Sequence, residues 1–172
     1  MARIRLITDK GQDLTPEQGE TFDWIVQSRG QMIRPFEVLL HSPQVARHTA
    51  ELGAKLRFGS ILSDHDRELV IITAARFHNC RFEWDSHLPH ARNAGVREEV
   101  VNYLEHEGGV ELTDGEALLI DFVRELCAES TVSEATFARA RGMLGEAGVV
   151  ELSATIGYYT MLAMVMGACD AC

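Results

Sequence analysis

Apolar residues recur along the chain at helical spacing, and polar residues between them supply helix start signals. Thr15-Pro16-Glu17-Gln18 is a capping-box pattern with proline at the first helical position. Further starts are indicated by Ser42-Pro43, Ser63-Asp64-His65-Asp66, Arg97-Glu98-Glu99, Thr113-Asp114-Gly115-Glu116 and Ser133. No strand–turn–strand signal such as Asn-Gly interrupts this pattern. The sequence therefore predicts an all-α protein, a helical bundle of about seven or eight helices.

Two apolar stretches are compatible with more than one structure. The run from Leu69 to Ala75 has the length of a buried strand, but its capped start and two alanines favour a buried central helix. Residues 152–169 carry no charge over 18 positions, which is near the length of a membrane span. Hydroxyl side chains lie within this stretch, and acids flank it at Glu151 and Asp170 without a basic anchor. We therefore expect a helix buried inside the protein or at a subunit contact.

Another helix is expected from about Cys80 to Asn93, with Gly95 as its stop signal. Pro89 falls inside it and is expected to kink or interrupt it, because proline lacks the backbone N–H that the helix requires.

Length and charge narrow the class of protein. The chain has 172 residues and no evident linker, so residues 1–172 are expected to form a single domain. Acidic residues outnumber basic ones, 26 to 16, which gives a formal net charge of −10. Such a surface repels phosphate backbones, so no nucleic-acid partner is expected. The first residues show no apolar export signal, and we expect a cytoplasmic protein with no membrane association whose four cysteines are thiols.

Chemically capable side chains are concentrated between positions 68 and 90. Cys80, Glu83 and His87 are spaced i, i+3 and i+7, so on a helix they lie on one face, and His90 continues it. A carboxylate four residues before a histidine can hold the imidazole in one tautomer. Glu68 begins the preceding helix, and a helical hairpin would bring it back beside Cys80.

Three interpretations of this face remain open on spacing alone. The first is acid–base catalysis by His87, oriented by Glu83 or Glu68. The second is a metal site, because Glu83, His87 and His90 form E-x3-H-x2-H, although Pro89 disturbs that geometry. The third is a polar network without chemistry between packed helices.

The cysteines also allow more than one interpretation. Cys80 lies near a helix N-terminus, where a thiolate is stabilised, although a buried cysteine is more often a small apolar residue. Cys169 and Cys172 have CxxC spacing, but we expect a frayed tail there. Cys127 follows an apolar helix face and is expected in the core.

A longer pattern runs through the same region: Leu62-x4-Arg67-Glu68-Leu69-Val70-Ile71, then Asn79-Cys80-x2-Glu83-Trp84-x2-His87-x4-Arg92-x2-Gly95-Val96. It resembles the carboxymuconolactone decarboxylase family, within the superfamily that also contains the alkylhydroperoxidase D proteins. The resemblance covers residues 42–127 as a core, with residues 128–172 as C-terminal helices that complete the bundle. The stretch Glu151-Leu152-x3-Ile156-Gly157-Tyr158-Tyr159 is similar to the family's last helix.

One departure from the peroxidase branch matters for function. That branch has a site of the form E-x11-C-x2-C-x3-H, and Glu68, Cys80 and His87 match its first, second and last positions. Glu83 replaces the second cysteine, so a dithiol mechanism within this motif is not available unless Cys169 or Cys172 supplies the second sulfur. Glu83 with His87 is instead similar to the decarboxylase branch.

The resemblance implies a cofactor-independent lyase that forms homo-oligomers, trimers or hexamers, and acts on a small carboxylated lactone or related organic acid. It implies catalytic roles for His87, Glu83, Glu68 and Cys80, and we predict no metal site. Candidate substrate-binding residues are Trp84, His90, Arg76 and Arg81; Arg92 is a further candidate cation, and Arg67 is expected to pair with Glu68. The alternatives are a one-cysteine peroxidase or thiol redox protein using Cys80, and a non-catalytic ligand-binding oligomer.

Overall fold

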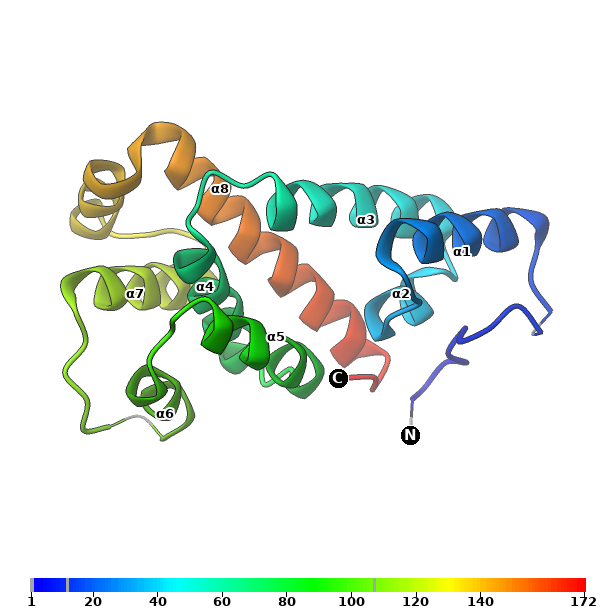
Figure 1. The fold of residues 1–172 in the computed structure, drawn as a ribbon, viewed down its shortest axis with the longest axis horizontal. Coiled ribbons are helices and arrows are strands. Elements are labelled where there is room, and N and C mark those ends of the chain that lie inside the picture. The colour runs from blue at the N-terminus through cyan, green and yellow to red at the C-terminus, as the bar shows by residue number, and fades with distance from the viewer. Residues whose placement is uncertain (1, 12, 107) are drawn as a thin grey trace.

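Helices account for all the regular structure in the computed structural model, which describes residues 2–11, 13–106 and 108–172 (Figure 1). Within these ranges there are eight helices and no strand, as the sequence predicted. They are α1 (Pro16–Arg29), α2 (Arg34–Leu39), α3 (Pro43–Phe58), α4 (Asp64–Phe77), α5 (Arg81–Asn93), α6 (Glu98–His106), α7 (Asp114–Glu129) and α8 (Glu134–Ala168).

The predicted start signals act as helix caps. The side chain of Thr15 accepts a hydrogen bond from the backbone N–H of Gln18, and Thr113 does the same for Glu116, so both capping boxes form. Ser63 and Ser133 cap α4 and α8 through their hydroxyl groups. Helix α2 was not predicted, because six residues are too few to show a helical period.

Helix α5 corrects one expectation. It is continuous from Arg81 to Asn93, and Pro89 lies inside it without interrupting it. Proline removes one backbone hydrogen bond, and the extensive packing of α5 against α4 supports the helix on either side of that gap.

Helix α4 is the centre of the fold. Its residues from Glu68 to Ala75 are all buried, which confirms the expected buried helix. It packs against α5, α7 and α8, and α5 returns antiparallel to it through a short turn. The buried face of α4 therefore positions any side chain that it shares with α5.

Helix α8 contains the uncharged stretch and crosses the molecule diagonally in Figure 1. Its path breaks at Gly145, whose φ of 70° suits glycine because a β-carbon is disfavoured there. By length and composition alone the helix could cross a membrane, but half of its most apolar window is buried inside the protein. Its packing on α4 and α7 is that of a core helix.

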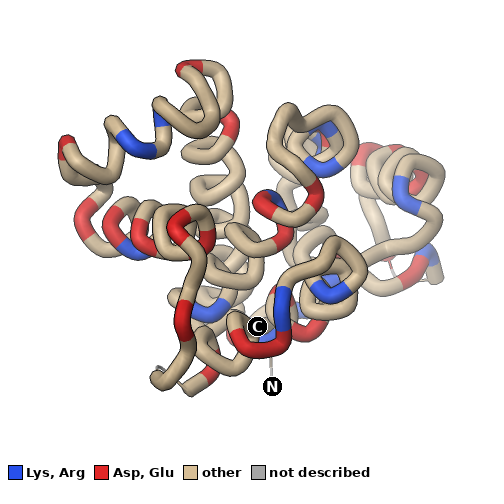
Figure 2. Tube along the Cα trace, turned by 60° about the vertical axis from the view of Figure 1, so that its left-hand side comes forward, with Lys and Arg blue, Asp and Glu red and all other residues tan. Residues whose placement is uncertain are grey.

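Acidic and basic positions are interspersed over the helices in the view of Figure 2. The net negative charge is therefore spread over the fold, and an anionic ligand requires a local positively charged group.

Candidate functional site

The α4–α5 hairpin brings Glu68 and His87 together. Asn79 turns the chain with a φ of 51°, and the backbone N–H of Cys80 donates to the carbonyl oxygen of Ala75 at 2.9 Å. In this register Nδ1 of His87 lies 2.8 Å from Oε2 of Glu68. The predicted hairpin is present, but it places Glu68 against His87, about two helical turns from Cys80.

His87 is buried and contacts side chains from both α8 and α5. Its residue exposure is 5%, and the ring of Tyr159 from α8 meets it edge-on with centroids 5.0 Å apart. Its Nε2 lies 3.7 Å from Oε2 of Glu83, one turn earlier on α5. Because Nδ1 engages Glu68, Nε2 is the nitrogen left for chemistry.

Burial and charge set the protonation of this pair. Burial lowers the pKa of His87, and the hydrogen bond and charge of Glu68 only partly oppose that effect. Burial also acts on Glu68, but its hydrogen bond to His87 and the nearby charges of His87 and Arg67 outweigh it and lower its pKa. At neutral pH the arrangement is therefore a carboxylate accepting the Nδ1–H of a neutral imidazole, with Nε2 free to accept a proton.

Glu83 is the third member of the group. Burial raises its pKa to about 7, and the charge of Arg57 only partly offsets this. Its exposure is 3%, and its Oε1 is buried without a hydrogen-bond partner. A buried, unpartnered carboxyl oxygen next to an acid–base histidine points to a site meant for a ligand or a proton.

A pocket of about 470 Å³ opens onto these groups. Glu83, His87 and His90 line it from α5, while Arg57 and Arg34 approach from α3 and α2. Arg34 pairs with Glu37 at 3.0 Å, whereas Arg57 has no ion-pair partner among the described residues. Arg57 is thus the cation available to an anionic ligand in this pocket.

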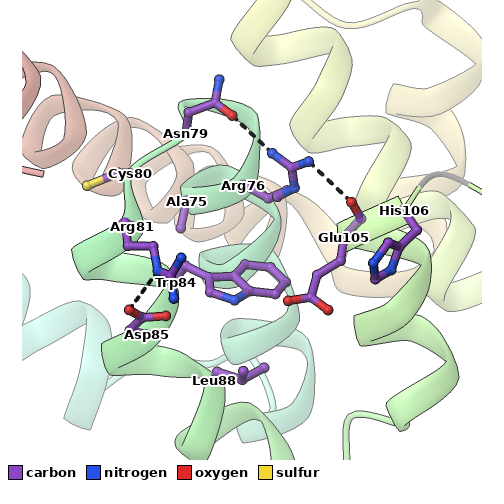
Figure 3. Close-up of a pocket in the computed structure, with 10 residues that line it drawn as sticks. All are labelled: Ala75, Arg76, Asn79, Cys80, Arg81, Trp84, Asp85, Leu88, Glu105 and His106. Atoms are coloured by element: carbon purple, nitrogen blue, oxygen red, sulfur yellow. Dashed lines mark hydrogen bonds and ion pairs between the residues drawn. The ribbon is translucent and has the colours of Figure 1, made fainter.

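The other predicted binding residues lie elsewhere. Cys80, Trp84, Arg76 and Arg81 border a different pocket of about 560 Å³ (Figure 3). There Arg76 donates to the carbonyl oxygen of Leu104 at 3.0 Å, and Arg81 pairs with Asp85 at 2.9 Å. The structure therefore divides the predicted site between two pockets, with His90 in the pocket of His87.

The two remaining candidate arginines are paired. Arg92 is paired with Glu98. Arg67 lies 2.9 Å from Asp64 and 3.6 Å from Glu68, so it does accompany Glu68, as expected.

Sequence reasoning missed two residues of the site. Arg57 is on α3, and no spacing along the sequence relates it to His87. Tyr159 lies in the segment that is similar to the family's last helix, but its ring contact with His87 depends on how α8 packs.

The cysteines differ from expectation. Cys80 and Cys172 form a disulfide, with Cα atoms 5.1 Å apart, so the expectation of four thiols is wrong for this pair. The segment after α8 folds back onto the start of α5, which no local pattern reveals. Cys127 and Cys169 are free and half-buried, and Cys127 packs against the core.

Glu83, His87 and His90 do not form a metal-binding arrangement in the structure. No group of three His, Cys, Asp or Glu side chains in the described ranges is placed to hold a metal ion.

The comparisons with known proteins agree with this architecture. Residues 43–107 match the model of the carboxymuconolactone decarboxylase family. An uncharacterised peroxidase-related protein from Silicibacter sp. TM1040 superposes with a TM-score of 0.77 at 15% identity, covering 99% of this chain and 91% of that one. A protein of unknown function from Agrobacterium tumefaciens, proposed to be the antioxidant defence protein AhpD, gives 0.65 at 18% identity, covering 78% and 93%. No curated protein sequence matches the chain.

The described helices therefore have the all-helical, alkylhydroperoxidase D-like fold of these two structures. The segment that matches the model of the carboxymuconolactone decarboxylase family holds Glu68, Cys80, Glu83 and His87.

Proposed function

We propose that the chain is a cofactor-independent lyase that acts on a small carboxylated lactone or related organic acid in the pocket around His87. The observation that carries this proposal is the buried group of Glu68, His87 and Glu83. Nδ1 of His87 is fixed at 2.8 Å from Glu68, and Nε2 faces a carboxyl whose pKa is about 7. At neutral pH His87 can accept a proton and Glu83 can donate one. The two residues therefore form an acid–base pair.

The proposed reaction requires the transfer of a proton to carbon after CO2 is lost. When a carboxylated lactone loses CO2, the carbon–carbon bond to the carboxylate breaks and its electron pair becomes a dienolate. One proton must then reach carbon. Protonated Glu83 can supply it through Nε2 of His87, while Glu68 stabilises the imidazolium that forms in passing. Glu83 regains its proton from solvent, so no other reactant is needed.

Arg57 supplies the cation that such a substrate requires. It lines the same pocket, is half-buried, and has no described carboxylate paired with it. His90 also lines this pocket and offers a further polar contact from α5. Arg76 and Arg81 are less suited to this role, because they face the other pocket and are already engaged.

Thiol chemistry at Cys80 is separable from this proposal. Its partner sulfur, Cys172, does not line the His87 pocket, and neither does Cys80.

A non-catalytic ligand-binding protein would keep the pocket and Arg57 but would turn over no substrate.

The test uses the full chain and a series of five-membered unsaturated lactones bearing a carboxylate, with CO2 release followed by ¹³C NMR. We expect turnover in the wild type and a loss of about 10²–10⁴-fold in His87→Asn, which removes general acid–base catalysis. Cys172→Ser is the matched control and is expected to retain turnover. Binding without turnover would support the non-catalytic alternative, and full activity of His87→Asn would contradict the mechanism.

The homo-oligomer remains part of the proposal. Exposed apolar side chains such as Leu52, Phe58 and Ile61 on and after α3 offer surface for a subunit contact. Light scattering coupled to gel filtration is expected to give a mass of three or six chains.

A further inference from the structure

The disulfide between Cys80 and Cys172 joins two elements that are far apart in sequence. Cys80 is the residue before α5, and Cys172 lies in the short segment after α8, 92 positions away. Neither cysteine is used by the proton chemistry at His87. The bond therefore needs its own explanation.

The two cysteine residues differ in exposure. Cys80 has no exposed surface, whereas Cys172 is exposed. Figure 3 shows the sulfur of Cys80 directed away from the indole of Trp84 and from the pocket that Trp84 borders. A thiol arriving from solvent consequently meets Cys172 first.

The position of Cys80 suits it as the leaving sulfur. It is the N-cap residue of a 13-residue helix, and no side chain caps that helix end. The free N–H groups and the dipole of the first turn stabilise a negative charge on the sulfur at that position. Opening the bond by attack at Cys172 releases the thiolate that the helix stabilises better.

The segment that carries Cys172 has anchors other than the disulfide. The backbone N–H of Arg3 donates to the carbonyl oxygen of Cys169 at 2.8 Å, and that of Ala171 donates to Met166 at 2.8 Å. Ala171 is buried. These contacts keep Cys172 near Cys80 after reduction, so the bond can form again.

We propose that Cys80 and Cys172 are a redox-active pair that exchanges with low-molecular-weight thiols, and that Cys172 is the sulfur that carries the mixed disulfide. A thiolate attacks Sγ of Cys172, a new sulfur–sulfur bond forms, and the electron pair of the broken bond leaves on Cys80. A second thiol attacks the mixed disulfide and releases the oxidised small molecule. Two thiols are thereby oxidised to one disulfide, and their two protons and two electrons end on Cys80 and Cys172.

Glutathione and its disulfide are the probes in the test, applied to the full folded chain and followed by alkylation and non-reducing peptide mapping. Reduced glutathione is expected to open the Cys80–Cys172 bond without unfolding, and the oxidised form is expected to restore it. Cys169→Ser is the matched control, a nearby free cysteine, and is expected to leave the equilibrium unchanged.

The variants that replace only one of these two cysteines, treated with oxidised glutathione, show which of the two sulfurs reacts. Cys172 in Cys80→Ser is expected to be glutathionylated at least about 10-fold faster than Cys80 in Cys172→Ser, because Cys172 is an exposed residue and Cys80 is fully buried. Rapid alkylation of the wild type during reduction gives the same information if a variant fails to fold, since the mixed disulfide is then trapped on Cys172. A bond that opens only on unfolding, or glutathione found on Cys80 or Cys169 instead, would overturn the proposal.

Discussion

Oε2 of Glu68 lies 2.8 Å from Nδ1 of His87, although the two residues are 19 positions apart and on different helices. The carboxylate fixes which imidazole nitrogen carries the proton and leaves Nε2 to face Glu83. The orientation of the candidate acid–base residue thus depends on the register of the α4–α5 hairpin.

Replacing Glu68 tests this relationship directly. In Glu68→Gln the pKa of His87 is expected to fall further below its ordinary value, because burial then acts without the opposing charge and charge-assisted hydrogen bond. Turnover by the proposed lyase is expected to drop by about 10- to 1000-fold. An NMR titration of the histidine rings measures the first effect. Glu51→Gln, which removes the partner of exposed His48, is the control, and an unchanged His87 titration in Glu68→Gln would contradict the assignment.

The raised pKa of Glu83 predicts how the free energy of unfolding depends on pH. Its pKa is raised from 4.5 to about 7 in the folded chain, so the folded state holds the proton more tightly than the unfolded state. The free energy of unfolding therefore declines as pH rises from the ordinary carboxyl value to about 7, by about 3 kcal/mol in total.

Glu83→Gln is neutral at every pH and should lose this decline. Relative to wild type, its stability is expected to rise by about 2–3 kcal/mol between about pH 5 and about pH 8. Urea denaturation at several pH values gives the difference. Glu99→Gln, an exposed carboxylate on α6, should follow the wild-type curve, and parallel curves for wild type and Glu83→Gln would show that Glu83 is ionised in the folded chain.

The sequence predicted the fold better than the site. Caps such as Thr15 and Thr113 act within one helical turn, so a local pattern reveals them. The pairing of Glu68 with His87 required the register of a hairpin, which spacing alone leaves undetermined. Arg57 and the Cys80–Cys172 bond depend on how α3 and the end of α8 pack, and no local signal encodes such contacts.

The capping box of α7 predicts a graded effect on stability. Glu116 accepts from the backbone N–H of Thr113 at 2.8 Å and pairs with Arg97 at 2.6 Å, and its pKa is lowered to about 2, chiefly by Arg97. Glu116→Gln can keep the box, as Gln18 does in α1, but loses the ion pair, so it should cost about 1 kcal/mol. Glu116→Ala loses both and should cost about 2 kcal/mol.

The pH dependence of these variants follows from the sign of the shift. A lowered pKa means that the ion pair stabilises the fold above the ordinary carboxyl value of 4.5 and loses that effect as pH falls towards 2. Urea denaturation should show wild type and Glu116→Gln converging at acidic pH. Equal stability of wild type, Glu116→Gln and Glu116→Ala at neutral pH would show that Glu116 does not stabilise the start of α7.

Gly53 on α3 provides the last prediction, because it lies directly under Tyr158 of α8. A β-carbon at this position would overlap the hydroxyl oxygen of Tyr158 and lie 2.7 Å from its Cζ. Tyr158 is buried, and its ring packs at 5.2 Å against that of Tyr159, which in turn contacts His87. Gly53→Ala is expected to destabilise the chain by about 1–3 kcal/mol through overpacking.

Gly157 is the matched control on the facing helix. A β-carbon there meets nothing within 4 Å, so Gly157→Ala is expected to stabilise α8 by about 0.5–1 kcal/mol, the ordinary helix preference for alanine. Thermal and urea denaturation of both variants give opposite signs if α3 and α8 meet as described. Because the shift of Tyr158 reaches His87 through Tyr159, Gly53→Ala should also lower turnover in the proposed reaction. A Gly53→Ala chain as stable as wild type would show that α3 and α8 do not approach this closely.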